Sequence, residues 1–173
     1  MTIHTKEHVY NVLKIRSMYD GDSAKVTCYR EFIVAGARYD FGFGDIIEVG
    51  SRSISKYTDI DCRMYGYDCP ELRDKRPDWK AAAYLARDVA RKWMEEAIES
   101  GSLKMQSHLV KDREEKGKFG RYLSNFWDER KNQLLMDFLI NRQLAVSYHG
   151  QNKAEIEDAH ETNIHFLKMT GEI

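Results

Sequence analysis

The stretch YNVLKIRSMYDGDSAKVTCY, from Tyr10 to Tyr29, decides the fold of this 173-residue chain. Its first part, up to Met18, is compatible with a β-strand, and Asp20-Gly21-Asp22 then supplies turn residues. The second part alternates small apolar with polar side chains, the period-two pattern of a half-buried strand, at Ala24, Val26 and Cys28. The stretch therefore predicts two strands joined by a tight turn.

Outward from this hairpin, strand signals come in runs with one helix between them. Residues 74–100 predict an amphipathic helix, because apolar residues recur at three- and four-residue steps, Pro77 lies near the start and Gly101 follows the end. The glycine-rich residues 30–57 predict an extended hairpin or a long loop inserted between strands. Further strands are predicted at 59–67, 103–109 and 121–127, and further helices at 134–142 and 153–168.

Five strands with one helix between the third and fourth indicate an α+β fold, an OB-type five-stranded β-barrel with three helices. The length suits one domain, residues 1–173. The net charge of −1 argues against tight non-specific DNA binding, although a local positive site would suffice for a nuclease. We expect a cytoplasmic protein with no membrane association, since the chain shows no secretory signal, no long apolar run and three cysteines read as small buried side chains.

Three short segments together indicate chemistry. They are Tyr19-Asp20-Gly21-Asp22-Ser23, Arg63-Met64-Tyr65-Gly66-Tyr67-Asp68-Cys69-Pro70-Glu71 and Lys118-Phe119-Gly120-Arg121. Each alone has an ordinary explanation as a turn, a loop before a helix or a hairpin tip. Jointly they offer hard oxygen ligands for Ca²⁺ and two guanidinium groups that can grip a phosphate through paired N–H donors. Such a site would hold an anionic substrate beside a divalent cation.

The same segments resemble the staphylococcal (micrococcal) nuclease family. The family pattern is a D-G-D-T/S turn, an arginine followed by D-x-P-E, a K-Y/F-G-R hairpin, and a helix that ends before L-A and a tyrosine. All four pieces occur in that order, the last as Leu144-Ala145-Val146-Ser147-Tyr148. The likeness spans about residues 10–148, most of the chain.

The resemblance implies a calcium-dependent endonuclease that cuts DNA or RNA with little sequence preference and leaves 3′-phosphate ends. Asp22, Asp68 and the Cys69 backbone carbonyl would then bind Ca²⁺. Glu71 would also belong to the metal site, and it would hold or deprotonate the attacking water as a general base. Arg63 and Arg121 would clamp the phosphate. The terminal phosphate and nucleotide would be contacted by Lys118, Phe119 and Tyr148.

Two alternatives stay open from the residues. The chain could be a catalytically weak OB-type module that binds either nucleic acid or a protein partner through the insert at residues 30–57. A zinc site at Cys62 and Cys69 with His108 or His149 is conceivable, but its spacing fits no zinc pattern.

Aromatic and imidazole side chains have a simpler interpretation. We expect Tyr19, Tyr65, Tyr67 and Trp127 to belong to the core, because they lie in predicted strands. The histidines His108, His149, His160 and His165 are interpreted as ordinary surface groups.

Overall fold

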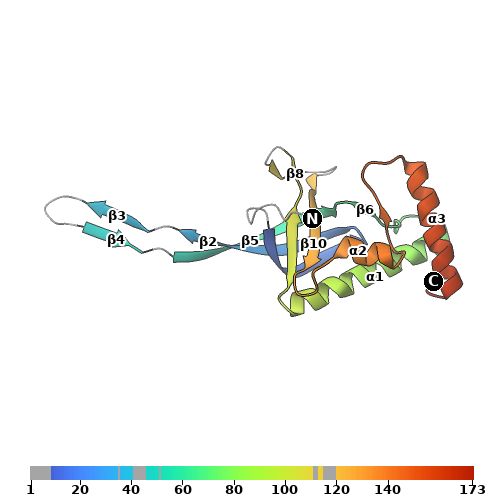
Figure 1. The fold of residues 1–173 in the computed structure, drawn as a ribbon, viewed down its shortest axis with the longest axis horizontal. Helices are drawn as coiled ribbons and strands as arrows, with labels where there is room; N and C mark the ends of the chain where they lie inside the picture. Colours follow the sequence, from blue (N-terminus) through green and yellow to red (C-terminus); the bar gives the residue numbers. More distant parts are fainter. Residues whose placement is uncertain (1–8, 35, 41–45, 51, 111–112, 115–119) are drawn as a thin grey trace.

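A computed structural model describes residues 9–34, 36–40, 46–50, 52–110, 113–114 and 120–173. Within these residues the chain forms a closed β-barrel and three helices, with a long hairpin arm that projects from the barrel (Figure 1). The predicted α+β fold, an OB-type barrel with three helices, is confirmed.

Five strands close the barrel. Their order is β10-β5-β2-β1-β7, and β10 returns to pair with β7. Neighbours are antiparallel except for β10 and β5, which run parallel. The bounds are β1 (Val9–Asp20), β2 (Ser23–Val34), β5 (Arg52–Met64), β7 (Leu103–Ser107) and β10 (Tyr122–Asp128).

The described residues of the 30–57 insert form paired antiparallel strands, the extended-hairpin form of the prediction and not the long loop. β2 and β5 stay in antiparallel register from Ser23–Arg63 out to Val34–Arg52, well past the end of the barrel. Two short strands, β3 (Ala37–Asp40) and β4 (Ile46–Val49), continue the ribbon outward. We call the part beyond Tyr29 and Tyr57 the arm.

Helix α1 (Pro77–Glu99) begins three residues later than predicted. Residue Arg76 is extended, with φ −73° and ψ 123°, because a residue that precedes proline avoids the helical region. The buried stripe of α1 includes Ala86, Ala90 and Met94, each fully buried, and it covers the barrel.

Two shorter elements complete the body. Helix α2 (Leu135–Asn141) follows β10, and α3 (Lys153–Thr170) is capped by Asn152, whose side chain accepts from two backbone N–H groups. None of the helices in the described ranges is long and apolar enough to cross a membrane. The remaining strands are two residues each: β6 (Tyr67–Asp68), β8 (Leu109–Val110), β9 (Arg113–Glu114), β11 (Gln133–Leu134) and β12 (Val146–Ser147).

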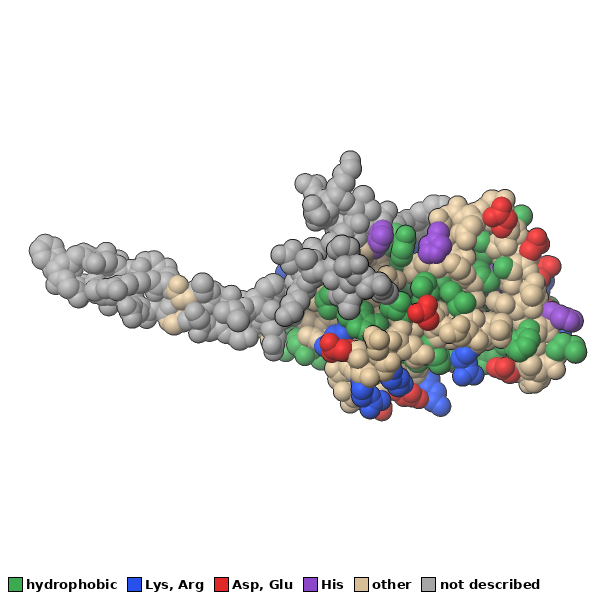
Figure 2. Space-filling view, in the orientation of Figure 1, with side chains coloured by type: hydrophobic (Ala, Val, Ile, Leu, Met, Phe, Trp, Pro, Cys, Tyr) green, Lys and Arg blue, Asp and Glu red, His purple; other side chains and the backbone are tan. Residues whose placement is uncertain are grey.

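The cysteines are core residues, as predicted. Cys28, Cys62 and Cys69 are each at most 2% exposed. Burial raises the pKa of the Cys62 thiol to about 12, so the thiol stays protonated at neutral pH. On the face shown in Figure 2, Lys and Arg side chains gather along the lower edge with some acidic ones among them, and the upper right carries acidic side chains.

Candidate functional site

One end of the barrel gathers the predicted site. The turn between β1 and β2 carries Asp22, and it is fastened to β5 by the Met64 N–H, which donates to the Asp22 carbonyl at 2.8 Å. Arg63 lies opposite Ser23 in the β2–β5 register, at the end of β5. Asp68 follows on β6, which pairs with β12. The fold thus brings together residues that are far apart in the sequence.

The Arg63 guanidinium bridges the two predicted metal-binding aspartates. Its Nη1 lies 2.5 Å from Asp22 Oδ1 and its Nη2 lies 2.6 Å from Asp68 Oδ1. Asp22 is 1% exposed, whereas a quarter of the Arg63 side chain reaches solvent. The Arg63 guanidinium therefore compensates the buried negative charge, and part of it remains accessible to solvent.

Backbone and hydroxyl groups hold the Asp22 carboxylate in place. Its Oδ2 accepts from the Cys69 N–H at 3.2 Å, and its Oδ1 accepts from the Ser23 hydroxyl at 3.2 Å. Gly21 lets this turn approach the β6 loop, because a Cβ there would lie 2.6 Å from Cys69 Sγ. The Asp22 carboxylate therefore has a fixed position.

His160 belongs to the site, and its interpretation as a surface group is wrong. It lies on α3, is 3% exposed, and its Nε2 is 3.1 Å from Asp68 Oδ2. Burial opposes ionisation of Asp68, but the hydrogen bond from His160 and the charge of Arg63 outweigh it and lower the pKa of Asp68. Asp68 therefore remains a carboxylate, oriented from the side of α3.

Asp20 is a third carboxyl group that the sequence interpretation did not assign. It is 8% exposed, and its Oδ1 makes no hydrogen bond to any residue that the structure describes. Burial raises the pKa of Asp22 well above its ordinary value; Arg63 offsets this in part, while the charges of Asp20 and Asp68 add to it. The Asp-Gly-Asp spacing, which puts both acids beside one turn, was the signal for this third group.

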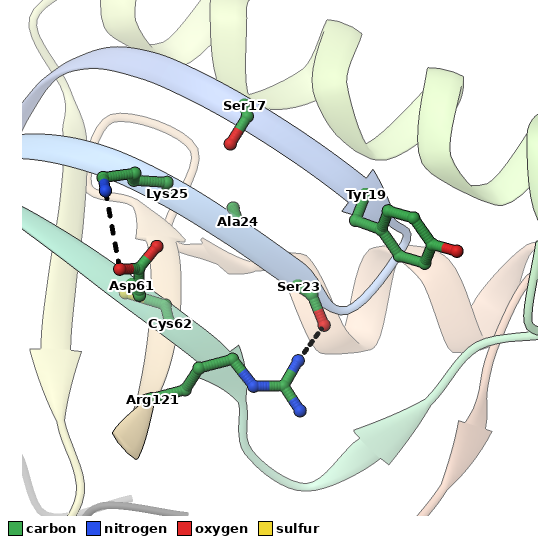
Figure 3. Close-up of a pocket in the computed structure, with 8 residues that line it drawn as sticks. All are labelled: Ser17, Tyr19, Ser23, Ala24, Lys25, Asp61, Cys62 and Arg121. Atoms are coloured by element: carbon green, nitrogen blue, oxygen red, sulfur yellow. Dashed lines mark hydrogen bonds and ion pairs between the residues drawn. The ribbon is translucent and has the colours of Figure 1, made fainter. Parts of the chain in front are cut away.

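The second arginine reaches the same end of the barrel. Arg121 precedes β10 and donates from Nη1 to the Ser23 hydroxyl at 2.9 Å, as Figure 3 shows. Since Ser23 also donates to Asp22, Arg63 bonds the Asp22 carboxylate directly and Arg121 is linked to it through the Ser23 hydroxyl. Both guanidinium groups therefore belong to one polar network.

Other predicted residues stand apart from that network. Glu71 lies on the loop between β6 and α1, where its side chain is exposed and, among the described residues, makes no hydrogen bond or ion pair. Tyr148 is partly buried beside β6, and its N–H donates to the Gly66 carbonyl at 2.9 Å. Lys118 and Phe119 lie outside the described residues.

The donor set suits a hard cation, although Arg63 now lies between the carboxylates. Three buried or partly buried aspartates and the Cys69 carbonyl are oxygen ligands of the kind that Ca²⁺ takes. Among the described residues no three acidic, histidine or cysteine side chains are already arranged around one point. The partnerless Oδ1 of Asp20 is the feature that a cation would satisfy.

Comparison with family models gives no match, and comparison with curated proteins gives none either.

Proposed function

We propose that this protein is a calcium-dependent phosphodiesterase that hydrolyses DNA or RNA strands. The observation that carries the proposal is the meeting of Arg63, Arg121 and the aspartates 20, 22 and 68 at one end of the barrel. Two guanidinium groups beside crowded carboxylates suit a substrate that is an anion and a cofactor that is a cation. A purely structural ion pair would need neither the second arginine nor the partnerless Asp20 oxygen.

The aspartates and the Cys69 carbonyl would hold the cation. A bound Ca²⁺ would supply positive charge next to the phosphate and lower the pKa of water at the site. His160 keeps Asp68 ionised and oriented, and the Cys69 N–H and the Ser23 hydroxyl orient the Asp22 side chain. Ligands fixed in this way cost little to organise when the cation binds.

The arginines would bind the phosphate and stabilise the charge that grows on its oxygens during attack. Arg63 is already anchored at the rim of the site, and Arg121 approaches from β10. Phosphoryl transfer requires little covalent chemistry from a protein, so positioning and charge account for most of the catalysis.

Glu71 is the candidate general base. Its exposed position on the loop after Pro70 leaves its carboxylate available to water. The water oxygen would bond to phosphorus, the bond from phosphorus to O5′ would break, Glu71 would accept the proton that water loses, and the leaving O5′ would take a proton from solvent. The products are then a 3′-phosphate and a 5′-hydroxyl end.

The direct test is cleavage of end-labelled single- and double-stranded DNA and RNA with Ca²⁺, with Mg²⁺ and with EGTA. We expect Ca²⁺-dependent cleavage that EGTA stops, with 3′-phosphate ends. Glu71→Gln removes the base and keeps the shape, so it should lower turnover by about a hundredfold or more.

Glu99→Gln, at the exposed end of α1, is the matched control and should leave turnover unchanged. Absence of cleavage with either cation would favour the alternative, a binding module. That alternative has one supporting observation, the arm, since a two-stranded ribbon offers unpaired strand edges to a partner.

A further inference from the structure

A small cavity opens on the outer face of the barrel next to Arg121. Its volume is about 150 Å³, and its lining comes from β1, β2 and β5 as well as from Arg121 itself (Figure 3). Of the residues to which the sequence resemblance gives a role, Arg121 lines this cavity, and Tyr19 and Ser23 from the first motif segment line it too. Because Arg121 is also part of the proposed phosphate clamp, whatever fills this cavity would adjoin a bound phosphate.

One end of the cavity carries a donor and an acceptor side by side. Lys25 on β2 lies in register with Ser17 on β1 and with Asp61 on β5, so the three side chains form a row across the strands. Lys25 Nζ lies 3.6 Å from Asp61 Oδ2, and both side chains are well exposed, at 43% and 60%. The pair is neutral overall, yet both partners keep hydrogen-bonding capacity for a ligand.

The other end carries an aromatic ring. Tyr19 is 50% exposed, so the prediction that it belongs to the core is wrong. Arg73 Nε donates to its hydroxyl at 2.8 Å, and the Arg73 guanidinium carbon lies 5.5 Å from the ring centroid. The ring is therefore held at the surface, at the opposite end of the cavity from Lys25 and Asp61 (Figure 3).

Size and charge together select a nucleobase. The cavity is about half the roughly 300 Å³ of the smallest drug-sized pockets, so it admits a ring system and not a whole nucleotide. A second phosphate is disfavoured because Asp61 cancels the charge of Lys25. A base, in contrast, offers donors and acceptors on one edge and an apolar face for Tyr19.

We infer that this cavity binds the base of a nucleotide that flanks the scissile phosphate, and that it favours guanine. The inference rests on the proposed nuclease function. A carboxylate can accept two parallel N–H bonds, and guanine alone among the common bases presents two such donors side by side, N1–H and N2–H. The Lys25 ammonium, whose Nζ lies 3.6 Å from Asp61 Oδ2, would then donate to the adjacent O6.

Binding tests the inference without any cleavage. The 3′- and 5′-monophosphates of guanosine, adenosine, cytidine and uridine are titrated into the metal-free protein, and the NMR shifts of the Tyr19 ring are followed. We expect the guanosine monophosphates to bind about three- to fivefold more tightly than the other nucleotides, a modest ratio because the groups are exposed. Asp61→Asn should abolish the preference.

Asp59→Asn is the matched control, a carboxylate one row further along β5 that lies outside the cavity. It should keep the guanine preference. Equal affinity for all four bases, or equal loss of preference in the two variants, would overturn the inference.

Cleavage then separates the two proposals. Sequencing of product ends should show guanine enriched at one position beside the cut in wild-type protein and no enrichment in Asp61→Asn. Cutting with no base enrichment keeps the nuclease and overturns the guanine site. Guanine-selective binding without any cutting overturns the nuclease and leaves the base site standing.

Discussion

The β2–β5 pair has an inner half in the barrel and an outer half in the arm. The two halves share one antiparallel ladder of backbone hydrogen bonds but differ in strand neighbours and in burial. In the barrel, β2 also pairs with β1 and β5 also pairs with β10, and inward-facing residues such as Val26 and Cys28 are at most 1% exposed. Beyond Tyr29, the described residues of β2 pair with β5 alone. On that side, residues 55 and 56 of β5 are exposed, and Tyr57 at the boundary is 62% exposed.

This difference explains where the chemistry lies. Catalytic groups need positions fixed to within about half an ångström, which packing from both sides provides. Arg63 and the Asp22 turn lie at the end of the inner half, where strands on either side hold them. A free two-stranded ribbon is only marginally stable in water, so the arm suits contacts that tolerate movement.

The largest effect is expected at the inner end, from Arg63→Ala. Loss of the phosphate clamp should lower turnover by about a thousandfold. The same change removes the cation that now lies between Asp22 and Asp68, so affinity for Ca²⁺ should rise by about tenfold. Calorimetric titration of Ca²⁺ and single-turnover cleavage measure the two effects separately.

Arg91→Ala provides the control, since this arginine forms an exposed pair with Glu95 on α1. It should change neither quantity. If Arg63→Ala instead weakened Ca²⁺ binding, Arg63 would be organising the aspartates and not competing with the cation.

A pair of glycines sharpens the comparison next. Gly21→Ala places a Cβ 2.6 Å from Cys69 Sγ and 3.2 Å from the Ala86 Cβ, so we expect a loss of about 1–3 kcal/mol in the free energy of unfolding. Gly50→Ala, between β4 and β5 on the arm, meets nothing within 4 Å and should cost at most about 0.5 kcal/mol. Urea denaturation of both variants gives the comparison.

The double variant Gly21→Ala/Cys69→Ala should recover part of the loss, because it removes the sulfur at 2.6 Å and leaves only the longer contacts, 3.1 Å to the Cβ of residue 69 and 3.2 Å to the Ala86 Cβ. No recovery would place the strain in the backbone of the turn.

Much of the fold could be predicted because its signals are local. Alternating residues around Val26 indicated a barrel strand, and the three- and four-residue spacing around Ala86 indicated α1. The exposure of Tyr19 was missed although it follows from the same alternation. Its neighbours Met18 and Asp20 both point inward, so Tyr19 must point out.

The site was predicted less completely because its partners are distant in sequence. The motif residues gave the Asp22, Arg63 and Asp68 cluster, but nothing in the residues around His160 indicates that α3 would bring it to Asp68. The sequence also did not indicate that Arg63 would bridge the two aspartates. It depends on the apposition of Ser23 and Arg63 in the strand register, which only the assembled barrel fixes.

A smaller effect than that of Gly21→Ala is expected from removal of the arm. Replacing residues 31–55 by Asn-Gly leaves Arg30 and Lys56, partners in the β2–β5 register, on either side of a two-residue turn. The shorter connection costs less entropy to close, and the pairing of strands in the barrel is kept. The free energy of unfolding should therefore change by less than about 1 kcal/mol. Turnover of short oligonucleotides, measured with saturating Ca²⁺, should stay within about threefold of the full-length chain, since the arm lies at the opposite end of the β2–β5 pair from Ser23 and Arg63. A loss as large as that of Arg63→Ala would mean that the outer half completes the site, and the division between a rigid inner half and a dispensable outer half would fail.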